Sequence, residues 1–184
     1  MRVIAGEWKG RRLATPSWDG LRPTSDRLRE TLFNVLGPRI AGARVLDAYA
    51  GTGAVGIEAL SRGAAHVTFM DRDRRAVQLI ERNLELCKAG GEVPRRYTVV
   101  SGDVTRWEPG SDAGFTLAWL DPPYDQDAGP ALRAIRPALA GDGMAILEHA
   151  TRRAPELPEG WTVTRTLVSG DSTLTFLRVT PGQP

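Results

Sequence analysis

Four consecutive residues, Asp121-Pro122-Pro123-Tyr124, could hold a planar group that carries an exocyclic amine. They directly follow the apolar segment 115–120, which is typical of a buried strand. Two prolines fix the backbone and remove its N–H groups, so the Pro122 carbonyl is left as a hydrogen-bond acceptor. This carbonyl and the Asp121 carboxylate could accept the amine hydrogens while the Tyr124 ring stacks on a base. A plain Asp-Pro-Pro turn is the alternative.

The chemistry suited to such a site is transfer of an activated group to nitrogen. An exocyclic nitrogen on a nucleobase is a poor nucleophile, because its lone pair is delocalised into the ring. With an already activated methyl donor, the enzyme would mainly orient the two reactants and localise that lone pair. Asp121 could stabilise the positive charge that develops on nitrogen and help to remove its proton. The same tetrapeptide would serve any exocyclic amine, and a protein glutamine amide as well.

A second motif, within residues 45–56, predicts a nucleotide-type cofactor site. The spacing Gly51-x-Gly53-x-x-Gly56 satisfies the dinucleotide fingerprint, and Asp71 follows 20 residues after Gly51, where it could hold ribose hydroxyls. Asp47 stands four residues before Gly51, where a carboxylate could reach a cationic amino-acid group. A pyrophosphate would gain nothing from that neighbour, so S-adenosylmethionine is favoured over a nicotinamide cofactor. A glycine turn that only packs helix on strand is the alternative.

The elements that must position these motifs alternate along the chain. From residue 43 onward, short apolar segments and helical patterns follow one another, which predicts a parallel sheet covered on both faces. Strands are expected at 44–49, 66–70, 97–100, 115–120 and 144–148, helices at 54–62, 73–88 and 130–140, and a hairpin at 161–168 and 173–179. Because ligands bind at the carboxyl ends of such strands, both motifs should face one cleft.

The first 40 residues differ from the rest in pattern and in charge. Residues 2–13 are expected to form a strand or ribbon, followed by a helix that Thr24 caps and that Gly37 and Pro38 end. Residues 1–40 carry a net charge of +4 and the other 144 residues −2. We therefore expect an N-terminal extension at 1–40 that contacts a polyanion and a catalytic domain at 41–184.

Composition excludes several other classes of protein. The 184 residues are 41% hydrophobic and 25% charged, which is typical of a globular chain of about one domain. A single cysteine, Cys87, and two histidines exclude a disulfide scaffold and leave little for a metal site. No apolar run reaches the ~18 residues of a membrane span, so we expect a cytoplasmic protein without membrane attachment.

Arginine dominates the basic residues and suits RNA. Of 24 basic residues 22 are arginine, which forks onto phosphates and stacks on bases, although genomic codon bias would give the same count. Trp8, beside basic groups, could stack on a base or pack in the ribbon. The candidate RNA-contacting residues are Lys9, Arg11, Arg12, Arg22, Thr24 and Arg27.

Three further motifs join the tetrapeptide and the glycine loop in a family resemblance. They are Lys9-Gly10-Arg11-x-Leu13, Arg22-Pro23-Thr24-x-Asp26-Arg27-x-Arg29-Glu30-x-Leu32-Phe33-Asn34 and Gly56-Ile57-Glu58-Ala59-Leu60-Ser61-Arg62-Gly63-Ala64. Together these motifs resemble the RsmD family of bacterial 16S rRNA guanine-N2 methyltransferases. The resemblance runs from Arg2 through the C-terminal hairpin. It implies an α/β, Rossmann-like, seven-stranded methyltransferase fold with a short N-terminal ribbon and helix extension.

The resemblance also implies a reaction and a set of roles. S-adenosylmethionine would be the donor, S-adenosylhomocysteine the product, and the substrate a guanine of 16S rRNA in an assembling or assembled small subunit. A monomeric enzyme without a metal is expected. The implied catalytic residues are Asp121, Pro122, Pro123 and Tyr124, and the implied donor-binding residues are Asp47, Tyr49, Gly51, Thr52, Gly53, Asp71, Arg72, Asp103 and Val104. Within the donor site Asp71 would hold the ribose and Asp103 the adenine.

Other functions remain open on the residues alone. Adenine-N6 methylation of DNA or RNA would use the same tetrapeptide, but the chain has no evident domain for reading duplex sequence. A nicotinamide-dependent oxidoreductase would explain the glycines and leave the tetrapeptide unexplained. A non-catalytic RNA-binding protein would leave both motifs without a use.

Overall fold

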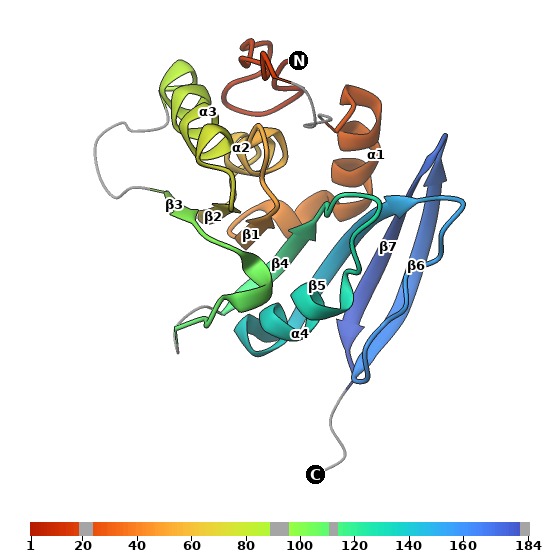
Figure 1. Cartoon of the computed structure of the whole chain (residues 1–184). Helices are drawn as coiled ribbons and strands as arrows, with labels where there is room; N and C mark the ends of the chain where they lie inside the picture. Colours follow the sequence, from red (N-terminus) through yellow and green to blue (C-terminus); the bar gives the residue numbers. More distant parts are fainter. Residues whose placement is uncertain (19–23, 89–95, 111–113, 181–184) are drawn as a thin grey trace.

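The computed structural model describes residues 1–18, 24–88, 96–110 and 114–180. Its centre is a seven-stranded sheet in the order β3-β2-β1-β4-β5-β7-β6 (Figure 1). The strands are β1 Arg44–Ala48, β2 His66–Asp71, β3 Tyr97–Ser101, β4 Phe115–Leu120, β5 Leu139–Ala150, β6 Trp161–Ser169 and β7 Ser172–Val179. Strands β1 to β5 pair in parallel, and β7 is antiparallel to both β5 and β6. The predicted fold class is confirmed.

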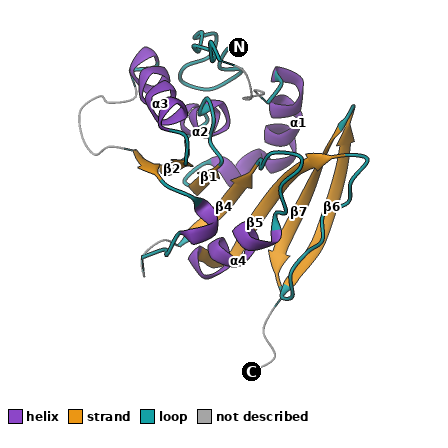
Figure 2. Cartoon of the chain, viewed as in Figure 1, coloured by secondary structure: helices purple, strands orange, loops and turns teal. Residues whose placement is uncertain are grey.

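Helices cover both faces of the sheet (Figure 2). The α-helices are α1 Asp26–Leu36, α2 Ala54–Ser61, α3 Arg74–Leu86 and α4 Gly129–Ile135, and the 3₁₀ helices are η1 Gly37–Ile40, η2 Val104–Arg106 and η3 Arg136–Ala138. Helices α1, α2 and α3 share one hydrophobic core with the sheet, whereas η2, α4 and η3 share a second core with its other face. Successive strand residues alternate between the two cores, as Leu117 and Ala118 do, because side chains point to opposite faces in turn. None of the described helices is long and apolar enough to cross a membrane.

Strand register brings the two chemical motifs together. Ala48 of β1 pairs with Met70 of β2 on one side and with Leu120 of β4 on the other. Leu120 in turn pairs with Leu147 of β5. The loops that follow β1, β2, β4 and β5 therefore leave the sheet side by side, around the point where the strand order reverses between β1 and β4. This is the expected position of a ligand cleft in an open α/β sheet.

The N-terminal segment forms a short, irregular ribbon with turns between its two arms: the backbone N–H groups of Val3 and Leu13 donate to the carbonyls of Arg11 (2.9 Å) and Met1 (3.2 Å). Its only bridge within the described residues outside the named strands joins Arg2 and Arg12. The buried Glu58 carboxylate of α2 accepts hydrogen bonds from the backbone N–H groups of Ile4 (2.7 Å) and Ala5 (2.9 Å). The Glu58 carboxylate thus attaches the ribbon to α2 through the two N–H groups that follow its first arm.

Two further buried polar residues hold the same segment. Ser61 Oγ donates to the Ala5 carbonyl and accepts from the Trp8 N–H, and Asn83 bonds both the N–H and the carbonyl of Ala14. Trp8 is 6% exposed and packs in the core that α1, α2 and α3 share with the sheet. Of the two roles considered for this residue, the structure therefore shows packing rather than base stacking. Gly6 has a φ of +81°, and a Cβ there would lie 1.9 Å from the Ser61 carbonyl oxygen. The segment therefore packs tightly against α2.

Several element boundaries differ from the expectation. Ser25, not Thr24, caps α1, since Ser25 Oγ accepts from the Leu28 N–H at 3.1 Å. The chain continues past Gly37 as η1, because Pro38 at the start of a helix needs no N–H partner.

The larger remaining differences lie at the ends of three elements, and several others differ from the expected bounds by one residue. The helix expected at 73–88 ends at Leu86, and the one expected at 130–140 becomes α4 followed by η3. Strand β5 begins at Leu139 rather than at 144. Its first residue pairs with Phe115 of β4, and a shift in register separates this pair from the regular pairing that starts at Leu117 and Met144.

Candidate active site

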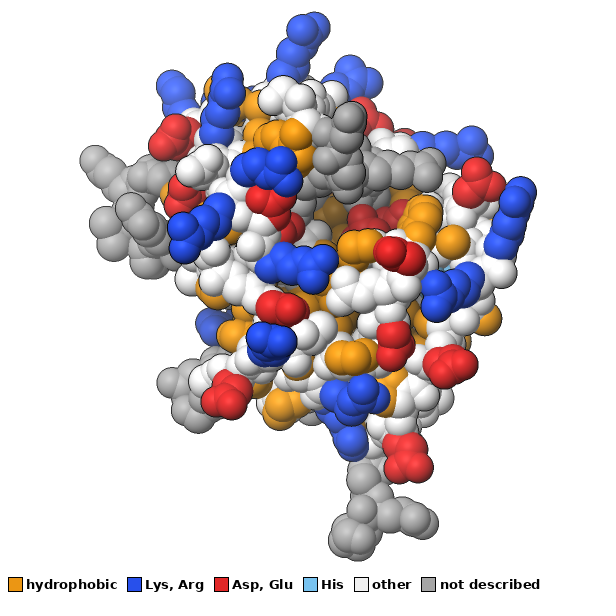
Figure 3. All heavy atoms as spheres, in the orientation of Figure 1, with side chains coloured by type: hydrophobic (Ala, Val, Ile, Leu, Met, Phe, Trp, Pro, Cys, Tyr) orange, Lys and Arg blue, Asp and Glu red, His pale blue; other side chains and the backbone are white. Residues whose placement is uncertain are grey.

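A cavity of about 580 Å³ lies at the carboxyl ends of the central strands, within the usual size range of small-molecule sites. Figure 3 shows the hollow from outside, with acidic side chains in its depth. It brings together eleven of the predicted site residues: Thr24, Asp47, Tyr49, Gly51, Thr52, Asp71, Arg72, Asp121, Pro122, Pro123 and Tyr124. The glycine loop and the tetrapeptide therefore face one space, as expected from the topology.

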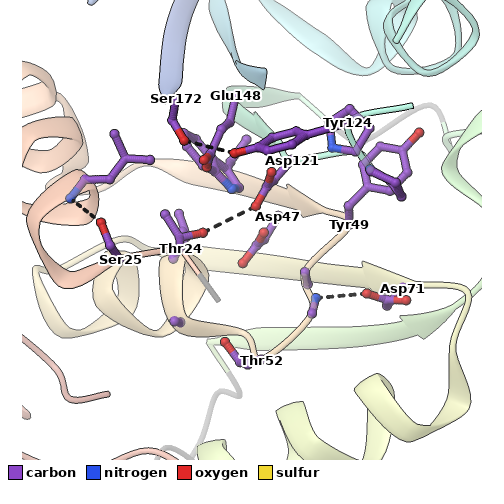
Figure 4. A pocket seen from close by; sticks show the side chains of 18 of the residues that line it. Thr24, Ser25, Asp47, Tyr49, Thr52, Asp71, Asp121, Tyr124, Glu148 and Ser172 are labelled. Atoms are coloured by element: carbon purple, nitrogen blue, oxygen red, sulfur yellow. Dashed lines mark hydrogen bonds between the residues drawn. The ribbon is translucent and has the colours of Figure 1, made fainter. Parts of the chain in front are cut away.

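The loop after β1 is shaped by left-handed backbone and by Asp71. Tyr49 (φ +67°), Gly51 (φ +55°) and Gly53 (φ +74°) all have positive φ, a conformation that costs glycine little and tyrosine more. Asp71 Oδ2 accepts from the Gly51 N–H at 2.9 Å, and Oδ1 accepts from the Asp73 N–H at 2.9 Å (Figure 4). Asp71 thus holds the loop in place and still lines the cavity with its remaining acceptor capacity.

Asp47 is a buried acid on the cavity wall. Its Oδ2 accepts from the Gly56 N–H at 2.8 Å, and the residue is 1% exposed. Burial raises its pKa to about 8; the Gly56 hydrogen bond opposes this effect, and the nearby charge of Asp71 adds to it. A bound cation would supply the compensation that this carboxylate needs to ionise. The ammonium group of an amino-acid ligand fits that requirement, and a pyrophosphate does not.

Three predicted donor-site residues do not line this cavity. Gly53 lies behind the loop, where a Cβ would meet the Ile80 side chain at 3.3 Å. Val104 is buried in the second core. Asp103 caps η2: its Oδ1 accepts from the Thr105 N–H and Oγ1, and these hydrogen bonds lower its pKa. Their role in donor binding stays a prediction.

The tetrapeptide is connected to distant parts of the chain. Thr24 Oγ1 donates to Asp121 Oδ2 at 3.4 Å, so the residue before the α1 cap contacts the candidate catalytic acid. The Tyr124 hydroxyl hydrogen-bonds Ser172 Oγ at 3.0 Å, and Arg153 donates to the Tyr124 carbonyl at 3.2 Å. These contacts fix the aromatic ring beside Asp121 at the cavity wall (Figure 4).

The predicted RNA-contacting residues lie outside the cavity, except Thr24. Lys9, Arg11, Arg12 and Arg27 are exposed, and basic side chains surround the N-terminal segment at the top of Figure 3. Arg11 also donates to the Leu86 carbonyl at the end of α3, at 3.1 Å. Arg22 lies outside the described residues.

The part of the chain that the structure describes contains no cluster of side chains suited to binding a metal ion. Among these residues no three His, Cys, Asp or Glu side chains are placed to hold an ion.

Comparisons with known proteins agree with the methyltransferase features of this site. The family described as Conserved hypothetical protein 95 matches residues 1–178. The chain belongs to this family. Over 174 residues it is 36% identical to ribosomal RNA small subunit methyltransferase D of Escherichia coli K12, covering 92% of this chain and 85% of that protein. It is 34% identical over 173 residues to the Haemophilus influenzae protein of that name, covering 92% and 89%. The resemblance to RsmD enzymes is confirmed.

Solved structures agree with the fold. The E. coli protein yhhF superposes on this chain with a TM-score of 0.84 at 32% sequence identity, with 98% of each chain covered. An RNA methyltransferase of Salinibacter ruber, solved with S-adenosylhomocysteine, has a TM-score of 0.67 at 14% identity, with 89% of this chain and 97% of that chain covered. The second likeness concerns the fold alone.

Sequence reasoning missed several residues on the cavity wall. Glu148 near the end of β5 and Ser172 at the start of β7 both line it. Trp18 and Arg75 also line it, and the Arg75 guanidinium lies 5.1 Å from the Trp18 ring centre. The position of Glu148 at the end of a predicted strand was the available signal. Nothing in the local sequence of Ser172 distinguishes it from an ordinary hairpin residue.

Proposed function

We propose that this protein transfers a methyl group from S-adenosylmethionine to the exocyclic N2 amine of a guanine in 16S rRNA. The observation that carries this proposal is that one cavity joins the glycine loop to the Asp121–Tyr124 tetrapeptide. The family relationship supports it, because relatives that match most of the chain are named ribosomal RNA small subunit methyltransferase D.

The residues at the ends of β1 and β2 suit the donor. Asp47 would pair with the ammonium of its amino-acid part, and Asp71 would accept from the ribose hydroxyls. Tyr49, Gly51, Thr52 and Arg72 also line the cavity and would contact the donor, with Gly53 shaping the loop and Asp103 and Val104 serving the adenine. When bound, S-adenosylmethionine supplies a methyl group activated by a positively charged sulfur.

The residues at the end of β4 would prepare the nitrogen. Asp121 and the Pro122 carbonyl would accept the two N–H bonds of the amine, which orients the nitrogen lone pair toward the donor side. Tyr124, with its hydroxyl bonded to Ser172 at 3.0 Å, would stack on the base. Asp121 would stabilise the charge on nitrogen as the N–C bond forms, and then accept the proton that N2 loses. Pro123 would keep the loop rigid.

Residues 1–40 would supply much of the grip on RNA, and residues 41–184 would hold the donor and the catalytic groups. Lys9, Arg12 and Arg27 are exposed and would contact phosphates, and Arg11 would do so from its position beside α3. Arg22 and Thr24 complete the proposed RNA-contacting set. We further propose a cytoplasmic monomer that acts on rRNA in an assembling or assembled small subunit.

A transfer assay tests the proposal. The protein is incubated with methyl-labelled S-adenosylmethionine and, in parallel, with 16S rRNA, small-subunit particles and duplex DNA. We expect label in rRNA or particles and none in DNA, and loss of the label with Asp121→Ala. Label only in DNA would contradict the substrate, and full activity of the variant would contradict the mechanism.

A further inference from the structure

Glu148 is a buried carboxylate beside the partly exposed Asp121. It stands one residue after Leu147, which pairs with Leu120, so the two acids each directly follow one member of a paired couple on adjacent parallel strands. Glu148 is 4% exposed and lines the cavity together with Asp121 and Tyr124. Figure 4 shows Glu148, Asp121 and Tyr124 gathered on the same side of the cavity.

The sheet holds Glu148 on the cavity side. Ile146, two residues earlier, packs in the core of the face that α1 covers, whereas Leu147 packs in the opposite core. Side chains alternate along a strand, so Glu148 shares the face of Ile146 and lies toward the start of α1. Its backbone pairs with Leu174 of β7. Strand pairing on both sides of β5 thus fixes where this carboxylate enters the cavity.

We propose that Glu148 accepts the N1–H of the target guanine and so selects guanine over other bases that carry an exocyclic amine. This inference rests on the proposed function. On the Watson–Crick edge of guanine, the N1–H donor stands directly beside the N2 amine, so the base presents adjacent donors. An ionised carboxylate only accepts hydrogen bonds. Asp121 at the amine and Glu148 at N1–H would therefore complement two neighbouring positions of this edge.

The same arrangement disfavours adenine and cytosine. In both bases the ring nitrogen beside the exocyclic amine is an acceptor, so its lone pair would face the Glu148 carboxylate without a hydrogen between them. A buried site built to receive a hydrogen bond rejects an analogue without the donor strongly, by about 10⁴-fold where this has been measured. Glu148 thereby gives a structural reason for guanine rather than adenine as the substrate, which the tetrapeptide alone does not provide.

The test uses a base analogue that keeps the 2-amine and loses the N1–H together with the O6 carbonyl, so the effect of Glu148→Gln on the preference isolates the part that depends on N1. After the modified guanine in 16S rRNA has been mapped, that position is replaced by 2-aminopurine, whose N1 is an acceptor. We expect the unaltered protein to methylate the guanine substrate at least ~100-fold faster than the analogue. In Glu148→Gln this ratio should fall by about tenfold or more, because the amide can turn its NH₂ toward the bare N1. Glu159→Gln, at an exposed position outside the cavity, is the matched control and should leave the ratio unchanged.

Each result has one meaning. If the unaltered protein forms no N2-methylguanosine, the proposed function fails and the inference fails with it. If it forms this product yet methylates 2-aminopurine equally well, only the inference is overturned, and this comparison needs no variant. An unchanged ratio in Glu148→Gln, with thermal stability and S-adenosylhomocysteine affinity retained, would also overturn it.

Discussion

The donor half and the acceptor half of the cavity are built in different ways. At the ends of β1 and β2, the contacts join residues close in sequence: Asp47 to Gly56, nine residues apart, and Asp71 to Gly51, 20 apart. At the end of β4 they join distant segments: Thr24 to Asp121, 97 residues apart, and Tyr124 to Ser172, 48 apart. The donor half is thus a local supersecondary unit, whereas the acceptor half exists only once the whole sheet has closed. Changes in each half should therefore have separable effects on donor binding and on transfer.

The largest expected effect is on transfer alone. Asp121→Ala removes the carboxylate that orients the amine and takes its proton, and the rate of methyl transfer should fall by about 10²–10⁴-fold. Single-turnover kinetics measures the rate, and titration with S-adenosylhomocysteine should give an affinity within about twofold of normal. Asp125→Ala, an exposed neighbour in the same loop, is the control. A large loss of donor affinity in Asp121→Ala would remove the proposed division between the halves.

The second effect is on donor binding. Asp71→Asn weakens both the hold on the Gly51 N–H and the acceptance of ribose hydroxyls. Affinity for S-adenosylhomocysteine should fall by roughly 10–100-fold, as expected for loss of one or two charge-assisted hydrogen bonds. Calorimetry provides the measurement, and Asp142→Asn, exposed and remote from the cavity, is the matched control. Normal affinity in Asp71→Asn would place the ribose elsewhere.

The third effect is a pH dependence confined to the donor half. Because the pKa of Asp47 is raised to about 8, this group is neutral in the unbound protein at lower pH. Pairing with an ammonium requires the carboxylate, so binding releases a proton and affinity should rise with pH, by up to about tenfold per unit below 8, and then level off. Titrations between pH 6 and 9 measure the slope. Asp47→Asn should bind more weakly with a flat profile, and a flat profile in the unaltered protein would contradict the assignment.

The smallest effect concerns RNA. Arg12→Gln and Arg27→Gln remove exposed charges, whereas Arg11 also bonds the end of α3, so its loss would mix binding with stability. Each exposed change should weaken rRNA binding and reduce the slope of log affinity against log salt by about one unit per lost phosphate contact. Filter binding at several salt concentrations measures this slope. The +4 charge of residues 1–40 would be incidental if the slope did not change and donor affinity fell instead.

The sequence was informative where structure is local. The alternation of strands and helices and the spacing of Asp47, Gly51 and Asp71 depend on neighbours within about 20 residues. The predicted sheet is confirmed, and Asp47, Gly51 and Asp71 line one cavity, whereas Gly53, Asp103 and Val104 do not. Element ends were less predictable. Thr24 and Ser25 are both competent helix caps; Ser25 accepts from the Leu28 N–H, whereas Thr24 donates to Asp121, 97 residues away, a contact that local sequence does not reveal.

The rest of the acceptor half required the strand order. Glu148 and Ser172 reach the cavity because β5 lies between β4 and β7, a relation that local patterns do not specify. The way the N-terminal turns attach to the core was unpredictable for a similar reason. They are held by Glu58, Ser61 and Asn83, three polar side chains whose burial becomes evident only when α2 and α3 are in place.

The identity of the modified nucleoside tests the central claim most directly. After reaction with unmodified 16S rRNA and small-subunit particles, the RNA is digested to nucleosides and analysed by mass spectrometry. We predict N2-methylguanosine at a single position, formed by the unaltered protein and lost with Asp121→Ala. N6-methyladenosine, or the absence of any methylated nucleoside, would contradict the account.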